Sequence, residues 1–449
     1  MLTSGHDFTR GDISKHVVMF SIPILVANVF QQLYSLVDLF IINRFLGIEA
    51  GAAIAPVGFL LQFSIIMAIS STIGVTVLVS NAFGANNQKK IHRITETGML
   101  LFLLISIIIG CIGTFFSPIF LRWMNIPNEI LPLTYTYGRI SFIGTPLLIG
   151  YNFFGALYRG VGDSKIPFRA AVVSTILNIF LDIISIRFLG MGIEGPAWST
   201  NISQAIGLIM MMIALKKRHP IFTFNWIKPH WESRIALNIL KIGFPIGVKD
   251  SLYFAGFLSL TSLVGSYGVP ALTAFSIATR IDTFIQAPMG SLGYGFSAFV
   301  SQNLGSRKID RVREGLHSTW KLGVIISIGT TILIWLLSEP IARLFSNSPN
   351  VNQLLIKYLR IVSICYVIYG ISEITSGIAM GSGQTRIMML SCVVAMWVVR
   401  IPLAFILSKL LNIGIVGVWI SIPSGWFVAL GFNYYVYVKR KWEKNTFSI

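Results

Sequence analysis

The residues best placed to do chemistry in this sequence are two carboxylates that stand inside long apolar runs. Asp38 is the single charged side chain between Lys15 and Arg44, and Asp182 lies in another such run with Asn178 four residues before it. The spacing of Asn178 and Asp182 places both on one face of a helix. Because a charge at bilayer depth is costly, it normally faces a cavity, a partner or an ion pathway.

These two acids are expected at similar depth. Asp38 precedes Arg44 by six residues and Asp182 precedes Arg187 by five, which at 1.5 Å per residue puts both about 8–9 Å inside the outer boundary of a membrane. Tyr137 and Thr200 are expected near the same level.

Two kinds of chemistry fit this set of oxygens. Desolvation and mutual repulsion favour a proton on one of two neighbouring carboxyls, so Asp38 and Asp182 could exchange H⁺. The oxygens of Asp38, Asn178, Asp182 and Thr200 could instead hold Na⁺. The purely structural alternative is that each acid caps or hydrogen-bonds a neighbouring helix. No other cofactor is expected.

The composition defines the class of protein that must position these residues. The chain has 449 residues, of which 54% are hydrophobic and 12% charged, whereas soluble domains carry about 25% charged residues. Apolar runs long enough to span a membrane recur along the chain, and they are too long for barrel strands. We expect an all-α polytopic membrane protein with twelve transmembrane helices, near 16–43, 51–83, 96–121, 131–158, 168–188, 193–215, 237–265, 270–303, 319–341, 353–381, 387–409 and 413–438.

The net charge of +18 reports topology rather than nucleic-acid binding. Clusters of Lys and Arg precede the first run and follow the even-numbered runs, and the other loops hold only scattered charges. This bias predicts that both termini are cytoplasmic. No cleavable signal peptide is evident, the three cysteines form no disulfide or metal pattern, and we expect a monomer in the plasma (inner) membrane, in contact with lipid.

The second half of the chain repeats the first at an offset of about 221 residues. Gly74 falls on Gly295 and Tyr137 on Tyr358. Since each half contains an even number of spans, both enter the membrane in the same orientation, as in transporters with parallel repeats. The expected organisation is a lobe at 1–215, a cytoplasmic linker at 216–236 and a lobe at 237–449, as two pseudo-symmetric six-helix bundles around a central cleft.

The carboxylate pair does not follow this symmetry. Asn178 falls on Val399 and Asp182 on Leu403, so the pair belongs to the first half alone. The second half has its own charged candidates, Asp250, Glu373 and Arg400, for which ion pairing and ligand binding both remain open.

Several stretches resemble the multidrug and toxic compound extrusion (MATE) family. They are 11–13 (GDI), 21–23 (SIP), 31–38 (QQLYSLVD), 44–47 (RFLG), 155–164 (GALYRGVGDS), 178–182 (NIFLD) and 192–197 (GIEGPA). The combination of Asp38 with Asn178 and Asp182 is similar to the DinF-like branch.

That resemblance implies two lobes forming a V-shaped cleft and export of small, cationic amphiphilic molecules against inward H⁺ or Na⁺. It further implies that Asp38, Tyr137, Asn178, Asp182 and Thr200 line a cation site, and that the first helix bends at Pro23.

The nearest alternative is a lipid-linked oligosaccharide flippase of the same superfamily, although about fourteen spans and a cationic cavity would then be expected. A major-facilitator transporter lacks support in the loop at 84–90. An aspartyl protease is disfavoured because Asp163 of its GxGD string lies in a basic cytoplasmic turn. A channel is disfavoured by the two-fold repeat, which favours alternating access.

Overall fold

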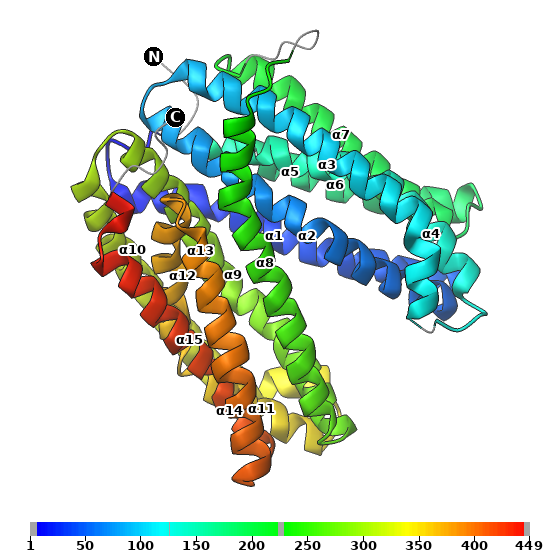
Figure 1. The fold of residues 1–449 in the computed structure, drawn as a ribbon. Helices are drawn as coiled ribbons and strands as arrows, with labels where there is room; N and C mark the ends of the chain where they lie inside the picture. Colours follow the sequence, from blue (N-terminus) through cyan, green and yellow to red (C-terminus); the bar gives the residue numbers. More distant parts are fainter. Residues whose placement is uncertain (1–6, 125, 223–228, 444–449) are drawn as a thin grey trace. The chain divides into compact units, whose positions relative to one another are not determined.

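A computed structural model describes residues 7–124, 126–222 and 229–443, and these described residues form helices and no strands. In Figure 1 the helices run in chain order from blue to red. Residues 223–228, within the predicted linker, lie outside the described part. The elements are α1 (Ile13–Leu46), α2 (Ile48–Gly84), α3 (Gln88–Trp123), α4 (Leu131–Ile143), α5 (Thr145–Gly160), α6 (Lys165–Ile183), η1 (Ile184–Phe188), α7 (Glu194–Arg218), α8 (Ser233–Gly265), α9 (Val269–Gly305), α10 (Ile309–Phe345), α11 (Pro349–Ser363), α12 (Tyr366–Gly381), α13 (Thr385–Cys392), η2 (Val393–Arg400), α14 (Ile401–Phe405), η3 (Ile406–Leu410), α15 (Ile415–Val438) and η4 (Lys441–Glu443).

These elements account for the twelve predicted spans. Among the described residues, eight helical segments are long and apolar enough to cross a membrane, and two bent helix pairs raise the number to ten. The long helices α8 and α9, which carry buried or half-buried charges such as Lys249 and Asp282, complete the twelve.

Two of the predicted spans are broken rather than continuous. The run at 131–158 is α4 and α5, bent by 43°, and the run at 353–381 is α11 and α12, bent by 52°. At the first break Gly144 lies against Asn201, whose amide Nδ2 donates to the carbonyl of Ile140 at 2.8 Å. The Ile140 carbonyl also accepts from the backbone N–H of Gly144 at 3.2 Å, so a side chain on another helix adds a second donor at the bend, which hydropathy alone could not reveal.

The chain forms two compact units whose boundaries cross helices. Among the described residues, unit 1 comprises Asp7, 23–124, 126–222 and 229–247, and unit 2 comprises 8–22 and 248–443. Unit 2 therefore contains the first part of α1, whose remainder belongs to unit 1, and unit 1 contains the first part of α8, whose remainder belongs to unit 2. The crossing points are Pro23 in α1 and Gly247 in α8, close to Pro245.

Packing inside the two units follows the internal repeat. In unit 1, α2 packs against α3 and α5, and α5 against α7; in unit 2, α9 packs against α10 and α12, and α12 against α15. The repeated glycines Gly74 and Gly295 have one physical role. A Cβ on Gly74 would lie 2.3 Å from the Ile239 carbonyl oxygen of α8, and one on Gly295 would lie 2.3 Å from Ser21 Oγ of α1. Each glycine lets the incoming half-helix approach closely.

The segments before the two crossing helices are anchored in matching ways. In unit 2, the backbone N–H of Phe8 donates to Gln302 at 3.1 Å, and its carbonyl accepts from Arg311 Nε at 3.0 Å. In unit 1, the backbone N–H of His230 donates to the buried Glu96 carboxylate at 3.0 Å. Both segments are fixed by polar side chains near helix ends of the same unit: Gln302 at the end of α9, Arg311 at the start of α10 and Glu96 near the start of α3.

Candidate functional site

The two carboxylates predicted from the sequence meet inside unit 1. Asp38 lies half-buried on α1, and Asp182 is fully buried near the end of α6, just before the π-helical turn η1. The two side chains are close enough to interact electrostatically. Because two like charges at such close range repel each other, this arrangement suits a pair that shares one proton.

Asn178 and Thr200 join the pair to α7. The hydrogen-bonding pattern assigns the Asn178 amide so that Nδ2 donates to Asp182 Oδ2 at 2.9 Å and Oδ1 accepts from the Thr200 backbone N–H at 3.2 Å. Ser199 lies close enough to Asp182 for their side chains to interact, and its hydroxyl donates to the Gly195 carbonyl at 2.9 Å. Asp182 is thus held by neighbours on α6 and α7, while Asp38 belongs to α1.

Tyr137 interacts electrostatically with both carboxylates from α4. It packs against an apolar cluster formed by Ile41, Ile42, Ala50, Ala53, Ile186 and Ile193. Ile41 and Ile42 follow Asp38 on α1 and Ile186 follows Asp182 on η1, whereas Ala50 and Ala53 belong to the start of α2 and Ile193 precedes α7. The cluster therefore supplies the apolar packing around Tyr137.

A cavity of about 220 Å³ lies within unit 1. Its lining runs along α1 from Pro23 to Tyr34 and includes Asn178 and Thr200. Asp38 and Asp182 each keep one buried carboxyl oxygen, Oδ1, without a hydrogen-bond partner. Since buried polar atoms are normally paired, these oxygens are acceptors available to a proton or cation.

The donor set bears on which cation could bind. Among the described residues, no three His, Cys, Asp or Glu side chains gather in one place. The oxygens near the pair, besides its own carboxylates, include the neutral ones of Asn178, Thr200 and Tyr34.

Sequence reasoning did not include Tyr34 in the site. Its hydroxyl lies 3.0 Å from Thr200 Oγ1 and connects α1 to α7. The available signal was its position four residues before Asp38, which places both on one helix face. Ser199 was also missed, because its contact depends on how α6 and α7 pack.

Asp250, Glu373 and Arg400 line a second cavity, of about 370 Å³, within unit 2. Asp250 pairs with Lys249, whose Nζ lies 3.2 Å from its Oδ1. The structure thus brings these three sequence candidates to one cavity, separate in the chain from the carboxylate pair.

The Asp163 turn has a structural role. Its carboxylate accepts from the backbone N–H of Lys165 at 2.9 Å and lies 3.0 Å from His219 Nε2, at the end of α7. Burial alone would raise the pKa of Asp163, but the hydrogen bond and charge of His219 and the backbone donors outweigh it and lower the pKa. The GxGD string therefore caps α6 and fixes the start of the linker.

Comparison with known proteins gives a consistent result. The MatE family model matches residues 23–184 and 245–406, one copy per repeat. The chain is 29% identical to the probable multidrug resistance protein YoeA of Bacillus subtilis over 96% of each chain. It is 25% identical to the multidrug export protein MepA of Staphylococcus haemolyticus over 90% of this chain and 89% of the relative.

Solved structures agree in fold. Two with 23% identity are described as MATE in the bent conformation (TM-score 0.92) and in the straight conformation (TM-score 0.91), each covering 98% of both chains.

Proposed function

Because the chain belongs to the MATE family, whose members are multi-pass membrane transport proteins rather than enzymes, we propose that it is a secondary active antiporter. It exports organic cations or drugs by alternating access, in exchange for H⁺ or Na⁺, and it acts as a monomer in the plasma membrane with both termini cytoplasmic. The observation that carries the proposal is the close interaction of Asp38 with Asp182 beside the cavity of unit 1.

The coupling follows from competition for the same oxygens. With the pair charged, the cavity of unit 1 is electrically suited to a cationic substrate. A proton or Na⁺ that binds the pair removes this attraction, so substrate and coupling ion bind alternately. Asn178, Thr200, Tyr137 and Tyr34 hold the carboxyls in place and provide neutral oxygens.

Pro23 supplies the conformational part of the proposal. Proline lacks the backbone N–H that would close a helical turn, and the boundary between the two units falls at this residue. Neutralising the pair allows α1 to bend there, which reshapes the cavity and displaces the substrate outward. The similar solved structures are described as MATE in a bent and in a straight conformation, which supports a protein with two states.

Transport into vesicles tests the function. Purified protein is reconstituted, and a pH gradient or a Na⁺ gradient is imposed separately while a fluorescent organic cation is followed. Uptake that is driven by one of the two gradients, and is absent when no gradient is imposed, supports antiport and identifies the ion. Translocation of a lipid-linked oligosaccharide without dye transport would favour the flippase instead.

A further inference from the structure

The cavity of unit 2 contains a buried cation that the proposed function has not used. Arg400, on η2, is only 5% exposed and lines the cavity together with Lys249, Asp250 and Glu373. A buried charge is costly unless it is paired. Its surroundings therefore indicate what it is there to bind.

Two of the other charges of the cavity form an ion pair with each other. Lys249 pairs with Asp250 at 3.2 Å and also interacts electrostatically with Glu373. Arg400, in contrast, has no carboxylate within 4.0 Å among the described residues. Its Nη2 donates to the Ile422 carbonyl at 2.7 Å, its Nη1 reaches the Met396 sulfur at 3.8 Å, and its Nε has no hydrogen-bond partner.

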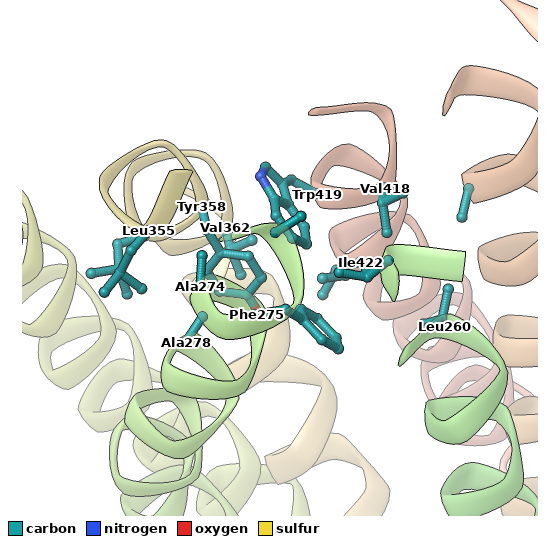
Figure 2. Packing of buried hydrophobic residues seen from close by; sticks show 14 of the residues in the cluster. Leu260, Ala274, Phe275, Ala278, Leu355, Tyr358, Val362, Val418, Trp419 and Ile422 are labelled. Atoms are coloured by element: carbon teal, nitrogen blue, oxygen red, sulfur yellow. The ribbon is translucent and has the colours of Figure 1, made fainter. Parts of the chain in front are cut away.

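Asp282 stabilises this guanidinium without binding it directly. The two interact electrostatically, but the oxygens of Asp282 accept hydrogen bonds of 2.6 Å from Tyr358 and Tyr366. The ring of Tyr358 packs edge-on against Trp419, with 5.0 Å between the ring centroids, and Trp419 stacks on Phe275 (Figure 2). Asp282 is therefore held by aromatic side chains, and Arg400 Nε keeps no hydrogen-bond partner and is left for another acceptor.

The dimensions and lining fit a small organic molecule. A volume of about 370 Å³ lies in the usual range for ligand sites, and the aromatic side chains Tyr253, Tyr294, Tyr369 and Trp426 line it. With Lys249 and Asp250 neutralising each other, the cavity presents one further anion, Glu373, and one further cation, Arg400.

We propose that Arg400 is an anion-recognition residue in this cavity, which takes zwitterionic aromatic molecules by binding a carboxylate at Arg400 and a cationic group on the Glu373 side. The planar guanidinium is suited to a carboxylate because it can donate two parallel hydrogen bonds. This inference rests on the proposed export of small organic molecules and narrows their class.

Two dyes that differ in one group test it. Rhodamine 110 carries a free carboxylate, and rhodamine 123 is its methyl ester and a simple cation. Binding to the full chain is measured by fluorescence anisotropy in a neutral maltoside detergent, where lipid phosphate is absent. No gradient is applied, so the result does not depend on whether transport is ion-coupled.

The wild type should bind rhodamine 110 more tightly than rhodamine 123. Arg400→Gln should weaken rhodamine 110 binding roughly tenfold or more, the usual effect of losing a charged hydrogen bond, and change rhodamine 123 binding little. Arg343→Gln, which removes an exposed arginine of the same unit, is the matched control and should change neither.

An equal loss for both dyes, or no loss for rhodamine 110, would overturn the assignment, as would a wild type without preference for the acid. If the glutamine variant does not fold, Arg400→Lys decides. It keeps the buried charge but loses the planar fork, so it should reduce the preference for rhodamine 110, and an unchanged preference would refute the proposal.

Discussion

Replacing Asp38 by asparagine tests the coupling mechanism most directly. The substitution preserves the size of the side chain but removes its ability to change charge. In the structure Asp38 interacts with Asp182. Because the pair has two carboxylates, it can carry at most two protons per cycle. We expect Asp38→Asn to insert and fold normally but to lose gradient-driven transport.

The size of the effect follows from the free energy of the gradient. Each proton supplies about 1.4 kcal/mol per pH unit. With the membrane potential clamped at zero and a gradient of one pH unit, exchange of one proton per cation sustains a concentration ratio of about 10, and exchange of two sustains about 100. The variant should reach a ratio near 1, at which the dye is only equilibrated.

The assay compares wild type, Asp38→Asn and Glu49→Gln in vesicles at equal protein content. Glu49 is an exposed carboxylate at the start of α2 in the same unit, so its loss should leave the ratio unchanged. A concentration ratio in Asp38→Asn equal to that of the wild type would exclude this carboxylate from coupling. If Na⁺ is the coupling ion, the same comparison applies with a tenfold Na⁺ gradient in place of the pH gradient.

Three further predictions concern the scaffold. Pro23→Ala should narrow the difference in α1 shape between low and high pH and slow transport several-fold; spin-label distances across residue 23 that differ as much as in the wild type would contradict the hinge. Gly74→Ala should destabilise unit 1 by about 1–3 kcal/mol, the usual cost of overpacking, because the added Cβ would lie 2.3 Å from the Ile239 carbonyl oxygen. The control Gly58→Ala should not destabilise it, since a Cβ there has no neighbouring atom within 4 Å. Thermal unfolding in detergent distinguishes the two variants. Asp163→Ala should cost about 0.5–2 kcal/mol through loss of the α6 cap. Because folding lowers the pKa of Asp163, the stability that its carboxylate contributes is fully present above the unfolded pKa of about 3.9 and is lost as the pH falls below that value. The melting temperatures of wild type and variant should therefore differ at pH 7 and converge in acid. A difference that stays constant with pH would contradict the charged cap.

The features that the sequence alone determined are those with a local physical cause. A carboxylate within an apolar run is costly wherever the helix packs, so Asp38 and Asp182 could be selected as functional candidates without coordinates. The twelve spans follow from hydrocarbon thickness and backbone hydrogen bonding within each helix. The repeat was visible in the spacing of residues such as Gly74 and Gly295, which both structural units use for close helix contacts.

Only the tertiary structure decided features that depend on side chains far apart in the chain. The contact of Asp38 with Asp182 joins α1 to α6, and Asp282 meets Tyr358 and Tyr366 across 76 and 84 residues. The crossing of α1 between units at Pro23, and the bend at Gly144, depend on which neighbours offer close packing or a hydrogen-bond donor. Arg400 shows the difference most clearly. Its charge is evident from the sequence, but the absence of a carboxylate partner among the described residues follows from the packing of the helices around it. That packing places Asp282 close enough to interact with the charge of Arg400, while two tyrosines occupy the carboxylate oxygens of Asp282.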